Sequence, residues 1–143
     1  MSFSTFFERD LDKIITEISL FENENDIWKL KEGIVNSAGN LALHIIGNLN
    51  HFIGTTLGNT GYVRNRDEEF SLKDIPFETL IADINDLKET VKNTLSKLSS
   101  SDLQNDFPIK IRDEVFSTQN MLVFLLAHLN YHLGQINYLR RMM

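Results

Sequence analysis

The C-terminal part of the chain, residues 119–143, reads QNMLVFLLAHLNYHLGQINYLRRMM. Drawn as a helix, this segment is apolar on nearly all sides, and Ser117 or Thr118 precedes it as a candidate N-cap. It closes with Arg140 and Arg141, whose positive charges suit the C-terminus of a helix. The sequence therefore predicts a long helix here, and we expect it to be the central and most buried one.

Two histidines, His128 and His132, stand four residues apart in this segment. At about 100° per residue they lie about 40° apart, on the arc that also carries Met121, Leu125 and Leu139, so they are predicted to face inward. Residues at this spacing have Cβ atoms about 5–6 Å apart, from which two imidazoles can converge on one metal ion. Gln135 shares that face and could hydrogen-bond a ligand, a water or a neighbouring side chain.

An earlier segment shows the same combination of apolar and histidine positions. Its apolar residues repeat at helical spacing between a candidate cap at Ser37 and the glycines from Gly54 onward: Leu41, Ile45, Leu49, Phe52 and Ile53. His44, Asn48 and His51 follow one another along the edge of this apolar arc. If this helix is antiparallel to the C-terminal one, His44 comes level with the region of His132.

The rest of the chain supplies two further helices. Apolar stripes run from Phe7 to Phe21 and, after a start signal at Asp74 and Pro76, from Leu80 to Leu98. Residues 58–75 lack periodicity and form a long connection, whereas residues 107–116 alternate partially, as in a small two-stranded ribbon. We therefore predict one all-α domain over residues 1–143: a four-helix bundle with a long crossover between its second and third helices, and a small β-ribbon before the fourth.

Composition narrows the functional classes. The chain has 143 residues, no cysteine and a net charge of -6, which disfavours nucleic acid as a partner and excludes thiolate metal sites. No segment reaches the roughly 18 apolar residues of a membrane span. Acidic residues at Glu8 and Asp10 argue against a signal peptide. We expect a cytoplasmic protein that does not bind membranes.

The histidines allow a simpler interpretation. An isolated histidine on an apolar face is more often a packed, hydrogen-bonded core residue than a metal ligand, and a metal-free interaction protein stays open on these grounds. Three inward histidines on two helices are harder to explain by packing, because each buried imidazole needs polar partners. A shared cation would supply one partner to each.

Three stretches together resemble the DinB/YfiT-like superfamily of small bacterial proteins: LALHIIGNLNHFIG (41–54), GYVRNRDEEF (61–70) and AHLNYHLGQINYLRR (127–141). The resemblance implies a four-helix bundle that holds a divalent metal on three histidines, which fall here on His44, His128 and His132. His51, two turns after His44, is the alternative ligand to His44, or a residue that lines the pocket.

The resemblance also implies function classes. Relatives include transferases and isomerases that use low-molecular-weight thiols, and hydrolases, so we expect a metal-dependent enzyme acting on a small-molecule substrate, a low-molecular-weight thiol among the candidates. Three imidazoles suit Zn or Ni first, with Fe, Mn and Cu as further candidates. The alternative is a non-catalytic metal-binding or stress-associated bundle, and a homodimer is expected in either case.

Polar residues around the histidines are the remaining candidates. Asn48 and Gln135 share the histidine line and are expected to line the pocket with His51. On the crossover, Arg66 and Glu69 are candidates for the pocket, because RNRDEEF resembles a recurrent segment of one branch of the superfamily. The alternative is a solvated loop in which Arg64 and Arg66 pair with the neighbouring acids. Tyr131 and Tyr138 lie one face away and are expected to pack or to meet a partner subunit.

Overall fold

The computed structural model describes residues 2–143, and over that range it contains helices and no β-strand. The elements are α1 (Phe3–Ser19), the 3₁₀-helix η1 (Glu24–Trp28), α2 (Ala38–Leu49), the π-helix η2 (Asn50–Thr55), α3 (Arg66–Ser71), α4 (Phe77–Leu95), α5 (Ser100–Gln104) and α6 (Thr118–Arg141). The predicted all-helical class is confirmed, and the four predicted helices correspond to α1, α2, α4 and α6. None of the helices described is long and apolar enough to cross a membrane.

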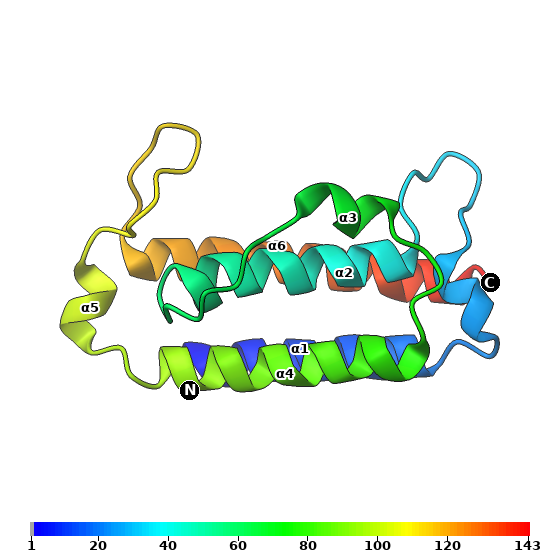
Figure 1. Cartoon of the computed structure of the whole chain (residues 1–143), viewed down its shortest axis with the longest axis horizontal. Helices are drawn as coiled ribbons and strands as arrows, with labels where there is room; N and C mark the ends of the chain where they lie inside the picture. Colours follow the sequence, from blue (N-terminus) through cyan, green and yellow to red (C-terminus); the bar gives the residue numbers. More distant parts are fainter. Residues whose placement is uncertain (1) are drawn as a thin grey trace.

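The four long helices lie side by side in two layers, α1 with α4 and α2 with α6 (Figure 1). Followed by colour from blue to red, α1 and α6 run in one direction and α2 and α4 in the opposite one. Polar side chains join neighbours: Asn130 of α6 donates a hydrogen bond to Asp10 of α1, and Lys88 of α4 pairs with Asp12 of α1. The helices α2 and α6 are therefore antiparallel, which is the condition under which His44 was predicted to come level with His132.

Serine caps begin three of the long helices. The side chains of Ser2, Ser37 and Ser117 each accept a hydrogen bond from a backbone N–H in the first turn of the helix that follows. These hydrogen bonds satisfy N–H groups that have no partner inside the helix. The predicted starts at Ser37 and Ser117 are confirmed, and α4 begins directly after Pro76, as expected.

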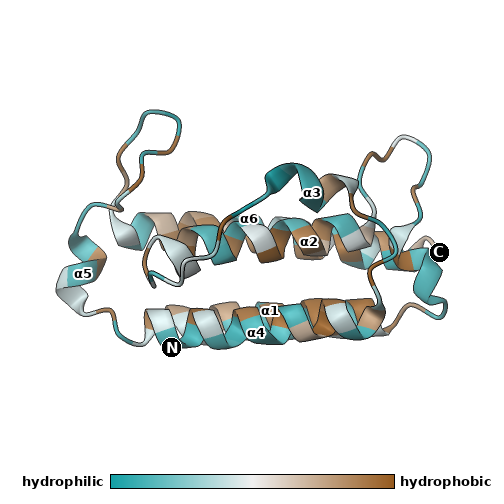
Figure 2. Ribbon diagram, viewed as in Figure 1, coloured by the Kyte–Doolittle hydropathy of each residue, from teal (hydrophilic) through white to brown (hydrophobic). Residues whose placement is uncertain are grey.

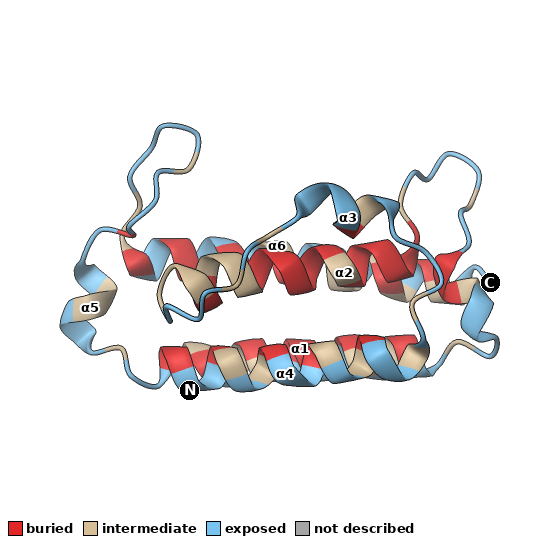
Figure 3. Ribbon diagram, viewed as in Figure 1, coloured by how far each residue is buried: buried red, intermediate tan, exposed pale blue. Residues whose placement is uncertain are grey.

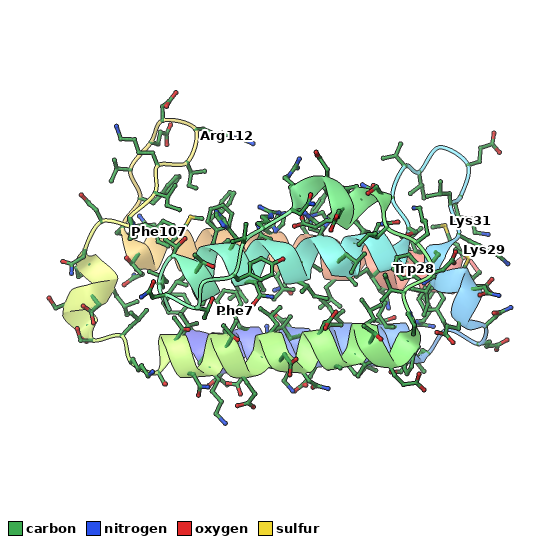
Figure 4. All side chains as sticks on the ribbon, in the orientation of Figure 1. Phe7, Trp28, Lys29, Lys31, Phe107 and Arg112 are labelled. Carbon is green, nitrogen blue, oxygen red and sulfur yellow. The ribbon has the colours of Figure 1, made fainter. Side chains whose placement is uncertain are left out.

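The core forms where the apolar stripes of the four helices meet. On α1 and α4 the brown, hydrophobic residues face the α2–α6 layer, whereas the teal residues face outward (Figure 2). Most stripe residues predicted from periodicity are almost completely buried, and only the stripe ends Phe21 and Leu98 are half-buried. The almost completely buried ones are Phe7, Leu11, Ile14, Ile18, Leu80, Ile84, Leu87 and Val91. With all side chains drawn, Phe7 lies between the helices, whereas Lys29, Lys31 and Arg112 lie on the outside (Figure 4).

The most buried helix is α2, and the prediction that the C-terminal helix would be the most buried is wrong. Every residue of α2 except Leu43 is buried (Figure 3). In contrast, α6 exposes Val123, Phe124, Tyr131 and Tyr138. The reason is that α3 and η1 both pack on α2 in addition to the long helices, whereas the short helix α5 meets α6 at its first turn, where Gln104 hydrogen-bonds Gln119.

Glycine lets one of these neighbours come close to α2. The ring of Trp28, in η1, lies against Gly39, where a Cβ atom would stand only 2.6 Å from it. No side chain larger than hydrogen fits at that position. Trp28 is buried, as expected of a packing residue.

The connections differ from the prediction in two places. The crossover between α2 and α4 contains the short helix α3, which begins at an Asn65 cap. The predicted β-ribbon is wrong: residues 106–117 form only two isolated bridges, Asp106 with Ser117 and Ile111 with Glu114. Pro108 lacks the N–H that a continuous ladder needs, so the pairing does not extend.

Candidate metal centre

Three imidazoles converge between α2 and α6. Nε2 of His128 lies 3.2 Å from Nε2 of His44 and 3.0 Å from Nε2 of His132. One nitrogen from each ring lies within 4.8 Å of the other two, a grouping that could hold a metal ion. The three histidines that the resemblance implied as ligands therefore do lie together, one from α2 and two from α6.

The spacing of these nitrogens fits a single divalent cation. Two imidazole nitrogens that bind one zinc ion at about 2.0–2.1 Å in tetrahedral geometry lie about 3.3 Å apart. The observed separations of 3.0 and 3.2 Å are close to this value. Small ring rotations would adapt the three Nε2 atoms to a common ion.

Hydrogen bonds at the opposite ring nitrogen orient two of the histidines. Nδ1 of His44 lies 2.9 Å from Oε1 of Glu69, and Nδ1 of His132 lies 2.7 Å from Oε1 of Gln135. Since a carboxylate can only accept, Nδ1 of His44 carries the proton, and we assign the same tautomer to His132. Both rings then point an Nε2 lone pair at the common centre, as histidine ligands of metals do.

Glu69 is held in place from two further sides. It lies in α3 and is buried. Its Oε2 accepts a hydrogen bond from Nε of Arg64 at 2.8 Å, and its Oε1 accepts one from Nη2 of Arg64 at 2.9 Å. Its carboxylate lies over Gly47 of α2, where a Cβ atom would stand 1.9 Å from Oε2. Arg64, Glu69 and His44 thus form a chain of paired groups that leads from the crossover to the histidine cluster.

Burial keeps the three imidazoles neutral. It lowers the pKa of His44 and of His132, in each case against a smaller opposing effect from the hydrogen bond at Nδ1. Burial, followed by the charges that His132 and His44 would carry, lowers the pKa of His128 to about 4. Neutral imidazole is the form that binds a metal, so the cluster has the right protonation at neutral pH.

The other predicted site residues fall in different places. Arg66 is exposed and lies over the ring of Phe70, and that ring lies 4.9 Å from the ring of His44 between centroids. His51 lies in η2, with its ring 4.7 Å from that of Phe52. The three histidines whose nitrogens lie within 4.8 Å of one another include His44 and not His51, the alternative ligand considered in its place.

Asn48 and Arg64 complete the surroundings. Asn48 is buried on the histidine face of α2, and its Oδ1 has no hydrogen-bond partner within residues 2–143. Arg64 was expected only as part of a solvated pair. Arg64 does pair with Glu69, but the pair lies mostly out of solvent and Glu69 also contacts His44. The order of charges along the sequence does not reveal this contact with a distant helix.

A cleft opens beside the cluster. It has a volume of about 520 Å³ and is lined by His132 and Gln135, together with the loop before α2 and the last turns of α6. A second cavity, of about 400 Å³, lies between α2, α3 and α4 and is lined by Glu69 and not by the three histidines. The cleft is therefore the cavity that adjoins an imidazole of the cluster.

These features define an all-helical protein with a three-histidine site that could hold a metal ion. Residues 6–143 match the model of a family described as "Protein of unknown function (DUF1572)", and the chain belongs to this family. The search of curated proteins finds no match.

Proposed function

We propose that the protein is a metal-dependent enzyme that binds a divalent cation on His44, His128 and His132, within a DinB/YfiT-like four-helix bundle. The observation that carries the proposal is the convergence of three Nε2 atoms from two helices at 3.0 and 3.2 Å. We further propose that it acts on a small-molecule substrate, as a thiol-dependent transferase or, second, as a hydrolase.

The donor set supports a catalytic site more than a closed one. A cation held by three neutral imidazoles keeps its full charge and an open position, and it supplies Lewis acidity or lowers the pKa of a bound water or thiol. Glu69 and Gln135 hold two of the rings at Nδ1. Arg64 compensates the charge of Glu69 and keeps its carboxylate directed at His44.

All-imidazole sites accept several ions, of which zinc and nickel are our first candidates and iron, manganese and copper the others. Neutral nitrogen donors do not favour the hard cations calcium and magnesium, which prefer oxygen ligands.

The experiment is metal analysis of protein purified without a polyhistidine tag, followed by assays of the loaded protein. We expect about one divalent ion per chain, retained on dialysis, and its loss in His128→Ala. The loaded protein is then assayed for conjugation of a small thiol to 1-chloro-2,4-dinitrobenzene and for hydrolysis of 4-nitrophenyl acetate. Absence of a stoichiometric ion, both as purified and after soaking with Zn²⁺ or Ni²⁺, would overturn the proposal.

A second candidate is a non-catalytic metal-binding bundle. It is supported by the position of the cluster between α2 and α6, where an ion would cross-link two helices. Removal of the ion with a chelator distinguishes the two candidates. Loss of a structural ion should lower the melting temperature strongly, whereas loss of a catalytic ion should leave a folded apo-protein.

A homodimer also belongs to this proposal. Its support is exposed apolar surface in the first half of α6, where Val123 and Phe124 lie outside the cleft. Sedimentation of the wild-type chain would test it.

A further inference from the structure

The cleft beside the histidine cluster is built from two parts of the chain that are far apart in sequence. One wall is the loop of residues 33–36, and the other is the C-terminal part of α6. His132 and Gln135 lie in the α6 wall, so the cleft adjoins one imidazole of the candidate metal centre.

The walls are mostly apolar. Large apolar or aromatic side chains supply the greater part of the lining: Ile34, Val35, Leu41, Tyr131, Tyr138, Leu139 and Met142. None of the lining residues is charged, although 34 of the 143 residues of the chain are Lys, Arg, Asp or Glu (14 basic and 20 acidic). Away from the cation, a carboxylate or phosphate would find no charged side chain in this lining, although Arg141 lies just outside it, over the ring of Tyr138. Burying an anion without a partner is costly.

Leu41 and Leu139 form the buried floor of the cleft, whereas other apolar side chains of its lining are accessible. Val35 is 84% exposed, Tyr131 65% and Tyr138 64%. Accessible apolar surface gathered in a concave site is typical of ligand-binding grooves. The volume of about 520 Å³ lies within the range of small-molecule sites, roughly 300–1,000 Å³.

We propose that this cleft binds the apolar part of the substrate, an uncharged alkyl or aryl group whose reactive end lies at the cation held by the three histidines. The inference rests on the proposed function and deepens it, because it names the substrate class. The presence of His132, a candidate ligand, in the lining favours a small molecule over a second copy of this chain, since a helix-to-helix contact needs no concave site beside a metal ligand.

The test uses two metal-binding probes that differ only in their apolar tail, acetohydroxamic acid and 4-phenylbutanohydroxamic acid. The protein is loaded with Co²⁺, and the binding of each probe is followed by the change in the visible absorption of the cobalt. We expect the phenyl homologue to bind at least about tenfold more tightly, because burial of its tail in the cleft adds hydrophobic stabilisation. Equal affinities for the two probes would overturn the inference and leave the metal centre intact.

A matched pair of variants locates the effect. Ile34 lies in the cleft and is 36% exposed, whereas Ile109 lies in the loop before α6, outside the cleft, and is 37% exposed. Ile34→Asp should reduce the tenfold preference to about twofold or less, and Ile109→Asp should leave it unchanged. Tyr138→Ser serves as a second cleft variant if Ile34→Asp does not fold by circular dichroism.

The remaining outcomes are distinguishable. If no cobalt spectrum appears, the proposed function fails and this inference with it. If Ile34→Asp leaves the probe preference unchanged and converts a dimer into a monomer in sedimentation, the cleft is an interface between copies of the chain, and the substrate assignment is overturned.

Discussion

Glu69 accepts a hydrogen bond from Nδ1 of His44 across 2.9 Å, although the two residues are 25 positions apart and lie on different helices. The same carboxylate is paired with Arg64. An acceptor at this nitrogen fixes the orientation of the ring and makes its other nitrogen a better electron donor.

Replacing Glu69 should weaken metal binding without unfolding the protein. Glu69→Gln keeps the size of the side chain and removes its charge, so we expect the affinity for Zn²⁺ to fall about tenfold or more. Competition with a chromophoric chelator would measure it. Glu68→Gln is the control, because Glu68 is an exposed neighbour on the same short helix and should bind the ion as the wild type does. Equal affinities in the two variants would contradict the assigned role.

Adding one methyl group at Gly47 should have the same effect. In a helix interior, Gly→Ala normally stabilises by about 0.5–1 kcal/mol. At Gly47 the new Cβ would stand 1.9 Å from Oε2 of Glu69, so the carboxylate must move away from His44. We expect Gly47→Ala to lose metal affinity about as much as Glu69→Gln does.

Gly134→Ala provides the comparison for that variant. A Cβ at Gly134, in α6, would have no other atom within 4 Å. We therefore expect the ordinary stabilisation in thermal unfolding, with metal affinity unchanged. If Gly47→Ala were also stabilised and kept its metal affinity, Glu69 could move away from His44 without weakening metal binding, and the prediction would be wrong.

The two histidines of the α2–η2 segment should differ sharply. Metal binding stabilises the folded state by about 2.7 kcal/mol when the free ion is at 100 times its Kd, which raises the melting temperature. We expect His44→Ala to abolish this rise and His51→Ala to retain it, as measured by differential scanning calorimetry with and without Zn²⁺. The opposite result would make His51 the ligand.

A buried carboxylate away from the metal centre should control acid stability. Burial raises the pKa of Asp10, but hydrogen bonds from Arg9 and Asn130 together with nearby positive charges outweigh burial, so the pKa lies below its ordinary value. A carboxylate with a lowered pKa stabilises the fold above the unfolded pKa of about 3.9, and this contribution is lost as the pH falls through the folded value.

We therefore expect Asp10→Asn to reduce the free energy of unfolding by about 1–3 kcal/mol at pH 7 and by less at pH 3. Urea unfolding at both pH values would measure the difference. Asp12→Asn is the control, because Asp12 is exposed and its pairing with Lys88 contributes little. A loss for Asp10→Asn that did not shrink at pH 3 would exclude an electrostatic origin.

Periodicity predicted the parts of the fold that depend on one helix at a time. The stripe of α4 and the caps Ser37 and Ser117 are local patterns, and they were predicted correctly. The most buried helix was predicted wrongly, because the burial of a helix depends on the other elements that pack against it. Apolar residues are spread around α6, but α2 is the more apolar helix and has the glycines that admit Trp28 and Glu69.

The histidine cluster was predictable because inward spacing on two helices and the family resemblance agreed. The chain from Arg64 through Glu69 to His44 was not, since it depends on how the crossover folds back over α2. The crossover folds back at the short helix α3. The local signal for this helix is an asparagine cap, Asn65, with three acidic residues in the first turn. The capping box of α5, formed by Ser99 and Asp102, was a comparable local signal that the segment SSSD contained and that was missed.

Gly47 donates no atom to the imidazole cluster, yet the hydrogen it carries in place of a side chain makes room for the acceptor of His44. A protein with the same three histidines but a bulkier residue in place of Gly47 has no room for this carboxylate. Its first histidine then needs a hydrogen-bond acceptor that approaches Nδ1 from another side. The combination of this glycine with a glutamate on the crossover is therefore a sharper diagnostic of this kind of centre than the histidines alone, and it can be sought in any related sequence without a structure.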